Sequence, residues 1–171
     1  MTLKKRSKVV KKRSKVGNYT GPTKAMKEVS FILDIKTDRP NVKYSNLGNV
    51  FVHTDAKLIS VEARHISYYN CNTGELTYLT TEEKQKPGFV GSTMTLYNKW
   101  SDNDGNMTSE TTKTFRTTKG FFTINEVVKK ICVFEMIDRP KSNWFGGIDA
   151  HHIHYENMSR GNKGYIIHYG S

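Results

Sequence analysis

The sequence has few cysteines and no long apolar run. These two features argue against a disulfide-rich secreted protein and against a membrane-spanning protein. Its 171 residues include only two cysteines, Cys71 and Cys132, whose spacing matches neither a disulfide framework nor a zinc motif. No apolar run approaches the ~20 residues of a membrane span, and none follows the basic start as in a secretory signal. We therefore expect a soluble protein of a reducing compartment, the cytoplasm or nucleus, with no membrane partner.

Acidic residues are missing from the first 27 positions, where basic residues are dense. The chain carries 27 Lys and Arg against 16 Asp and Glu, a net charge of +11. Ten of the basic residues and none of the acidic ones lie in residues 1–27, which leaves 17 against 16 for the rest. Nearly all the net charge therefore belongs to one short segment, and the body behind it is close to neutral.

This basic segment contains a repeat: the six residues KKRSKV at 4–9 return unchanged at 11–16. Such a block of like charge repels itself and has little apolar surface to bury, so we expect it to be disordered when free. Each phosphate that it neutralises releases counterions, so nucleic acid is the expected partner. The composition is also typical of a nuclear-import signal, which an import receptor would bind, and of a solvated tail. The predicted nucleic-acid-binding residues are Lys4, Lys5, Arg6, Lys8, Lys11, Lys12, Arg13 and Lys15.

A Gly21-Pro22 turn signal predicts the boundary between a disordered arm, residues 1–22, and a single domain, residues 23–171. Within that domain, apolar residues alternate with polar ones over 28–36, which predicts a half-buried strand. The Asp104-Gly105 pair suits the turn of a hairpin. The other predicted strands are 49–53, 58–69, 75–80, 89–100, 107–117, 121–124, 127–137, 148–155 and 165–169.

We find helical spacing in no window of eleven or more residues and expect only about one helical turn, near 125–130. Ile131, Val133 and Phe134 are predicted to be buried in the strand 127–137. Eight to ten short strands with turn signals at regular intervals predict an all-β fold, an antiparallel sandwich or barrel.

Four of the six histidines, His151, His152, His154 and His168, lie near the end of the sequence. On a strand, His152 and His154 would share a face and His168 could lie across from them, an arrangement that can hold zinc. The Gly146 and His-x-His spacing resembles half of a cupin motif, although Glu156 comes too early. We interpret the histidines as packing or subunit contacts. No metal, cofactor or catalytic residue is assigned, and we expect no enzyme activity.

The aromatic residues allow two interpretations, because a β surface can use them for packing or for stacking on bases. We interpret most of them as core or subunit contacts, with a single-strand binding groove as the alternative. These residues are Tyr68, Tyr69, Tyr97, Trp100, Phe121, Phe122, Trp144, Phe145, Tyr155 and Tyr169.

A basic arm, a Gly-Pro turn and a near-neutral all-β domain resemble in layout the coat proteins of very small icosahedral viruses and satellite viruses. The resemblance covers the whole chain and involves no signature motif. It implies an eight-stranded jelly roll that assembles with copies of itself into a shell, and an arm that contacts the packaged RNA or DNA. Such a protein would occur in the virion and in the host cytoplasm or nucleus.

Two alternatives belong to other classes. A viral movement or nuclear-shuttle type protein would use the same arm to carry nucleic acid without assembling into a shell. A metal-dependent, cupin-like β-barrel enzyme would instead be centred on the histidines near the end of the sequence.

Overall fold

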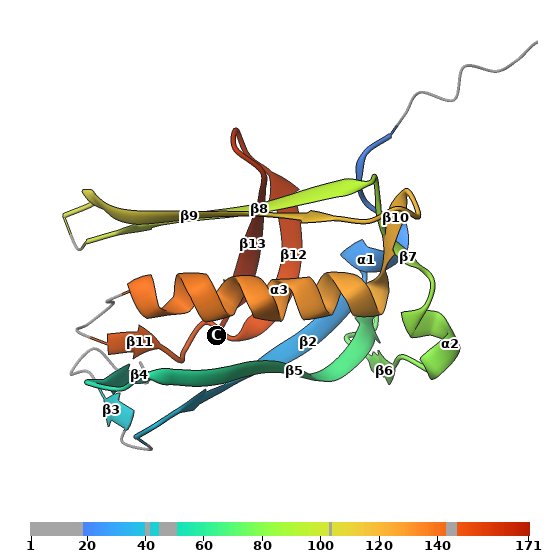
Figure 1. Ribbon diagram of the computed structural model, residues 1–171. Coiled ribbons are helices and arrows are strands. Elements are labelled where there is room, and N and C mark those ends of the chain that lie inside the picture. Colours follow the sequence, from blue (N-terminus) through green and yellow to red (C-terminus); the bar gives the residue numbers. More distant parts are fainter. Residues whose placement is uncertain (1–18, 40–41, 45–50, 103, 143–146) are drawn as a thin grey trace, which may run out of the picture.

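The computed structural model describes residues 19–39, 42–44, 51–102, 104–142 and 147–171. Its largest element is a seven-stranded sheet that curls around one long helix (Figure 1). The strand order is β6-β5-β2-β12-β13-β8-β9, and every neighbouring pair is antiparallel except β13 and β8, which are parallel. These strands are β2 (Val29–Thr37), β5 (Leu58–Tyr69), β6 (Leu76–Tyr78), β8 (Thr93–Ser101), β9 (Met107–Arg116), β12 (His154–Arg160) and β13 (Tyr165–Gly170).

Two three-stranded sheets lie near opposite ends of the long helix (Figure 1). One has the order β1-β7-β10 and the other β11-β4-β3. Their strands are β1 (Gly21–Pro22), β7 (Pro87–Val90), β10 (Phe121–Thr123), β3 (Val42–Tyr44), β4 (Phe51–Thr54) and β11 (Gly147–Asp149). The short helices are α1 (Lys24–Lys27), α2 (Thr81–Lys84) and the 3-10 helix η1 (Arg139–Lys141). No helix in the described residues is long and apolar enough to cross a membrane.

The long helix α3 (Ile124–Asp138) begins at a capping box. The Thr123 side chain accepts from the Glu126 amide at 3.1 Å, and the Glu126 carboxylate accepts from the Thr123 amide at 2.8 Å. These two bonds satisfy amides that the first helical turn would leave open. The apolar residues of α3 then recur at helical spacing and pack against the sheet. Its buried apolar residues are Ile124, Val127, Val128, Ile131 and Phe134.

The core lies between α3 and the concave side of the large sheet. Phe31 of β2 and Tyr155 of β12 stack with ring centroids 4.5 Å apart, which ties the two strands together at the centre of the sheet. Aromatic rings of β7, β10 and β13 close the core near the start of α3. The fully buried apolar side chains include Met26, Phe31, Leu33, Phe89, Met94, Leu96, Phe122, Ile124, Ile131 and Phe134.

The mostly β character is confirmed, with antiparallel and mixed sheets. The predicted strand over 28–36 and the hairpin around Asp104-Gly105 are present as β2 and β8–β9. The jelly roll and its eight strands are not confirmed, because seven strands form one sheet and further strands form two smaller ones.

The strand predicted over 127–137 is wrong, since these residues lie in α3. The β-branched and aromatic residues there favour strands in isolation, but their spacing buries one face of a helix. Val133 is 45% exposed for the same reason, because it lies on the outer face of α3. The short helix α2 was not among the predicted elements either.

Gly21 and Pro22, predicted to form the boundary, belong to the folded body. They are buried as strand β1 and pair with Val90 and Phe89 of β7. The Tyr165 hydroxyl donates to the Thr20 carbonyl at 3.0 Å, so the body includes residues before this pair. The separation of the chain into one arm and one domain stays a prediction.

Candidate functional site

The eight Lys and Arg residues predicted to bind nucleic acid, between Lys4 and Lys15, lie outside the described residues. The structure therefore does not place them, and their role stays a prediction. The described chain starts at Tyr19, whose hydroxyl donates to the Pro22 carbonyl at 2.7 Å. Tyr19 is thus held close to strand β1.

The three histidines considered as metal ligands are not brought together. His152 precedes strand β12, which begins at His154, so the two do not share a strand face. His154 lies opposite Gly170 of β13, whereas His168 lies opposite Asn157. The three histidines therefore do not form the shared strand face that was considered for zinc. Among the described residues, no group of three or more His, Cys, Asp or Glu is placed to hold a metal ion.

His168 and His152 contact different partners. The His168 Nε2 atom lies 2.7 Å from the Ser159 hydroxyl, on the neighbouring strand. The His152 Nδ1 atom lies 2.9 Å from the Asp149 Oδ2 atom, and the Asp149 Oδ1 atom accepts from the main-chain amides of His151 and His152. Asp149 is therefore the residue that orders the segment between β11 and β12.

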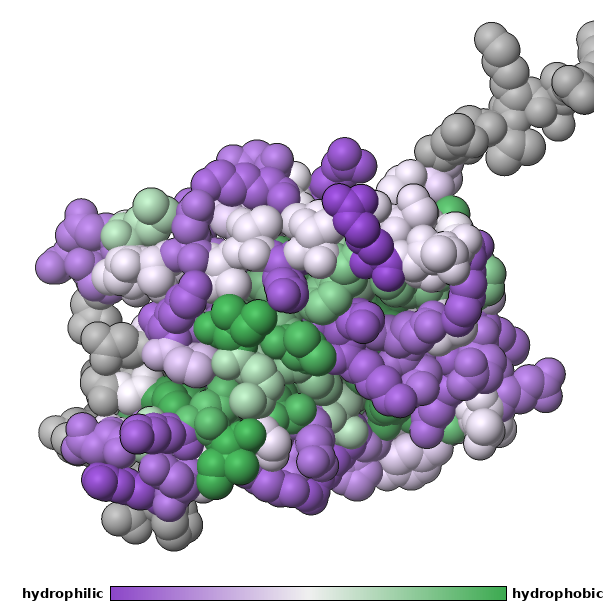
Figure 2. Space-filling model, viewed as in Figure 1, coloured by the Kyte–Doolittle hydropathy of each residue, from purple (hydrophilic) through white to green (hydrophobic). Residues whose placement is uncertain are grey.

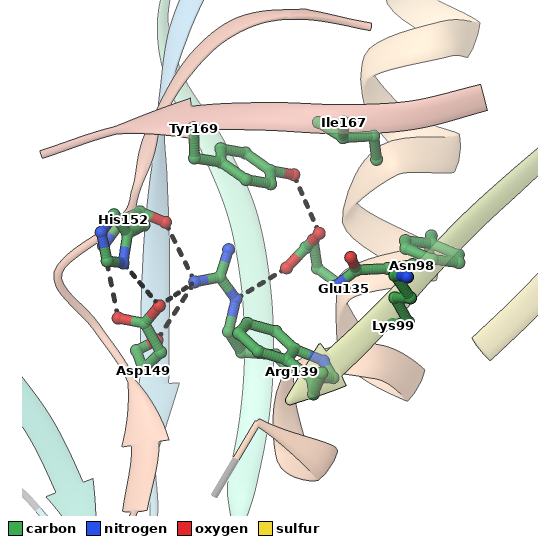
Figure 3. A pocket seen from close by; sticks show the side chains of 10 residues that line it. Asn98, Lys99, Glu135, Arg139, Asp149, His152, Ile167 and Tyr169 are labelled. Atoms are coloured by element: carbon green, nitrogen blue, oxygen red, sulfur yellow. Dashed lines mark hydrogen bonds and ion pairs between the residues drawn. The ribbon is translucent and has the colours of Figure 1, made fainter. Parts of the chain in front are cut away.

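The most unusual feature of the body is a group of buried charges at the end of α3. Glu135, Asp138, Arg139 and Asp149 have exposed fractions of 2%, 0%, 1% and 1%. Ionised groups rarely lie at such depth unless they are paired. We call Glu135, Arg139, Asp149 and Tyr169 the Arg139 centre (Figure 3).

The guanidinium of Arg139 connects three segments of the chain. Its Nε atom donates to the Glu135 Oε2 atom at 2.7 Å, one helical turn earlier. Its Nη1 atom donates to the main-chain carbonyls of His152 at 2.9 Å and Asp149 at 3.3 Å, and lies 3.6 Å from the Asp149 carboxylate. Tyr169 of β13 donates to the Glu135 Oε1 atom at 2.9 Å. The centre thus joins α3 to β11, β13 and the segment between β11 and β12.

Asp138 makes the matching connection to strand β8. Its Oδ2 atom accepts from the Asn98 side-chain amide at 2.7 Å and from the Trp100 indole at 3.0 Å. Its Oδ1 atom is buried and has no hydrogen-bond partner in the described part of the chain. A buried carboxylate oxygen without a partner costs free energy, so this end of α3 is not optimised for stability alone.

Burial controls the ionisation of the Arg139 centre. Loss of hydration raises the pKa of Glu135 above its ordinary value, although the charge of Arg139 opposes the change. Burial, and next the negative charge of Glu135, raise the pKa of Tyr169 well above its ordinary value. Tyr169 therefore stays protonated at neutral pH and acts as a hydrogen-bond donor to the carboxylate.

A cavity of about 160 Å³ opens beside the Arg139 centre. Figure 3 shows one terminal nitrogen of Arg139 directed toward Tyr169 without a marked interaction. This nitrogen, Nη2, has no hydrogen-bond partner among the described residues, whereas Nε and Nη1 are both bonded. The cavity is lined by Asn98, Lys99, Trp100, Phe134, Glu135, Arg139, Asp149, His152, Ile167 and Tyr169.

This cavity is the candidate site of the body, because it combines a buried cation, carboxylates and three aromatic rings. Pockets with a few convergent polar groups on an apolar lining are the usual form of small-ligand sites.

Comparisons of the chain with protein families, with curated proteins and with solved structures found no match.

The sequence interpretation missed the Arg139 centre, although one signal was present. Glu135 and Arg139 are four residues apart, the spacing at which a carboxylate and a guanidinium pair on a helix. Recognising it requires the helix, and the Thr123-x-x-Glu126 capping box was the signal for that helix. Asp149 and Tyr169 had no such signal, because only the tertiary fold brings them to α3.

Proposed function

We propose that this protein is a viral coat protein that assembles with copies of itself and packages nucleic acid through its basic arm. The observation that carries the proposal is the separation of charge. Ten basic residues and no acidic ones lie in residues 1–27, against 17 and 16 in the rest. A near-neutral body can pack against further copies without strong repulsion, while the arm neutralises phosphates.

Exposed apolar residues on two different surfaces support self-assembly. Val133 and Ile137 lie exposed on α3, where Figure 2 shows an apolar patch that continues toward β5. Tyr69, Leu76 and Tyr78 lie exposed on β5 and β6. Contiguous exposed apolar surface is typical of protein contacts. A closed shell needs more than one kind of contact per copy, and these two groups of exposed residues can supply such contacts.

The eight-stranded jelly roll remains the part of this proposal that rests only on the resemblance in layout. A jelly roll places its eight strands in two sheets, whereas the large sheet here contains seven strands in one continuous order. The proposal needs complementary surfaces and an arm, and it does not depend on that topology.

The same difference favours a second candidate, a movement or nuclear-shuttle type protein that carries nucleic acid without forming a shell. It would use the arm for phosphates and, as an import signal, for an import receptor. Both candidates place the protein in the host cytoplasm or nucleus, and only the coat protein also occurs in the virion.

Size-exclusion chromatography with light scattering, followed by electron microscopy, separates the two candidates. The coat-protein proposal predicts particles of megadalton mass that contain nucleic acid. A monomer or small oligomer that binds nucleic acid at all concentrations tested would support the carrier and overturn the shell.

Removing residues 1–16 tests the arm itself. We expect the truncated protein to keep the melting temperature of the full chain and to lose nucleic-acid binding. For the full chain, eight engaged charges on a single strand predict a slope of about −5 to −6 in log K against log salt. A slope near −1, or equally tight binding without the arm, would contradict the assignment of phosphate contacts to these residues.

A further inference from the structure

We propose that the cavity beside Arg139 binds a single unstacked pyrimidine base, so that the body contributes a base contact in addition to the phosphate contacts of the arm. This inference rests on the proposed function, because bound nucleic acid is what would present a base to the body. Four observations on the cavity support it: its size, its donor, its acceptors and its aromatic walls.

The size of the cavity suits one six-membered ring. A protein cavity of about 150 Å³ is known to hold a benzene molecule. The cavity beside Arg139 measures about 160 Å³, so it has room for one planar six-membered ring with its substituents. A single ring therefore matches this volume, and the pyrimidines are the bases that have a single ring.

The donor is the Nη2 atom of Arg139. The guanidinium is held rigidly, because Nε and Nη1 are bonded to Glu135, to His152 and to Asp149. Its remaining nitrogen has no hydrogen-bond partner among the described residues, and the side chain is 1% exposed. The guanidinium carbon lies 5.1 Å from the centroid of the Tyr169 ring, so Nη2 faces that ring at the cavity. There it can donate to a ligand that brings an acceptor, such as the ring carbonyl of a pyrimidine.

The acceptors lie next to that donor. Both Glu135 oxygens accept one hydrogen bond each, and a carboxylate oxygen can accept a second. A donor beside an acceptor matches the adjacent carbonyl and N–H groups of uracil or thymine. The same arrangement disfavours an anion, because Glu135 and Asp149 already surround the guanidinium with negative charge.

Three aromatic rings line the cavity, and Trp100 is the one available for stacking. The Arg139 guanidinium carbon lies over the Tyr169 ring, 5.1 Å from its centroid, and Phe134 is buried. The Trp100 indole donates to Asp138 at 3.0 Å and the Tyr169 hydroxyl to Glu135 at 2.9 Å. A ring fixed in this way loses little entropy when a base stacks on it. Lys99 is exposed at the cavity and could contact the phosphate that follows the bound base.

The test uses the full-length protein and neutral nucleosides, which carry no phosphate for the arm to bind. Isothermal titration with uridine, thymidine, adenosine and guanosine should show saturable binding of the two pyrimidine nucleosides. Binding should be at least tenfold weaker for the purines and should change little with salt, since no counterions are released. No saturable binding of any nucleoside, or a preference for purines, would overturn the proposal.

Two isoleucines on neighbouring positions of β13 give a matched pair of variants. Ile167 lines the cavity, whereas Ile166 points to the other face of the sheet, where its side chain lies against Gly161. Ile167→Phe should fill the cavity and weaken uridine binding at least tenfold, and Ile166→Phe should leave it unchanged. Equal affinities in both folded variants would contradict the site. Should Ile167→Phe fail to fold, Lys99→Ala provides a third variant with an exposed substitution, which should weaken thymidine 5′-phosphate and leave thymidine unchanged.

A comparison of oligomers separates this site from the arm. An oligothymidylate should bind several-fold more tightly than an abasic oligomer of equal length, and Ile167→Phe should abolish that difference. If the abasic oligomer binds and no difference is found, the arm is right and the base site is wrong. If neither oligomer binds, the proposed function itself fails.

Discussion

The two ends of helix α3 are built from opposite kinds of interaction. At the start, Thr123 and Glu126 satisfy each other's amides, and the rings of Phe89 and Phe122 meet edge to face at 6.1 Å. At the other end, Glu135 and Arg139 are buried with Asp138, and one Asp138 oxygen has no partner within the described residues. The first end fixes where the helix begins. The second keeps charged groups in the interior, where they cost stability and are available to a ligand.

The largest effect should follow the loss of Arg139. Arg139→Met leaves the buried Glu135 and Asp149 without their cation, so we expect a loss of about 3–5 kcal/mol in the free energy of unfolding. Urea denaturation followed by circular dichroism measures it. The control is Arg116→Met at the exposed end of β9, which should change stability by less than about 0.5 kcal/mol. Equal effects of the two substitutions would mean that the Arg139 centre contributes nothing to the fold.

A smaller effect is expected at the start of the helix. Thr123→Ala removes the side chain that accepts from the Glu126 amide, and the cost of a lost N-cap is about 1 kcal/mol. The same urea experiment applies, with the exposed Thr118→Ala as its control. If Thr123→Ala lowers the free energy of unfolding as much as Arg139→Met does, then the buried charges do not make the two ends of α3 different in stability.

The pH dependence of stability should have opposite signs at the two ends. The hydrogen bond from Lys119, and next that from the Thr123 amide, lower the pKa of Glu126, so its contribution is present above about pH 4.5 and is lost as pH falls. Burial raises the pKa of Glu135, so its contribution is present below about pH 4.5 and is lost as pH rises through the raised value.

Two variants test these signs by urea denaturation between pH 3 and pH 8. The stability lost in Glu126→Gln relative to the wild type should grow as pH rises. The stability lost in Glu135→Gln should shrink over the same range, because the wild type alone loses stability there. Parallel curves for the two variants would contradict the contrast between the ends.

The smallest expected effect is on the reaction rate of Cys132. This residue lies within α3, between its two ends, and its thiol can react only when the structure around the helix opens. Burial raises its pKa to about 11, so only about a thousandth of it is thiolate at pH 8. Cys71 is exposed and should react first with a disulfide reagent, without a change in stability. In Cys71→Ser, the slow reaction of Cys132 should accelerate when Arg139→Met is added and much less with Thr123→Ala. Similar rates of Cys132 reaction in these two variants would show that the helix does not open from the end at Arg139.

The sequence allowed part of this fold to be predicted, for identifiable physical reasons. Strand β2 and the β8–β9 hairpin depend on local alternation and on a turn pair, Asp104-Gly105, in which Gly105 adopts a φ of 82°. Helix α3 was missed because Val127, Val128, Ile131 and Phe134 have strand-like preferences that tertiary packing overrides. The curvature of the sheet, which lets one helix fill its concave side, has no local signal at all.

The candidate site was harder to predict than the fold. The spacing of the histidines near the end of the sequence is compatible with a shared strand face. Strand β12, however, begins at His154 and leaves His152 outside it. Arg139 belongs to an Asp-Arg-Pro sequence that is typical of a loop, and here it forms the short helix η1. Asn98 and Tyr169 meet this helix end from strands β8 and β13, and such long-range contacts cannot be inferred from spacing.

The central place of β12 and β13 has a consequence for the synthesis of the chain. These strands contain residues 154–170, yet they lie between β2 and β8, which leave the ribosome much earlier. Phe31 must wait for Tyr155 before the two rings can stack, a delay on the order of 10 s at usual elongation rates. During that interval β2 and β8 each have an uncovered edge in the nascent chain. Chaperones that cover strand edges should therefore raise the yield of this protein, and translation that slows before residue 154 should lower it.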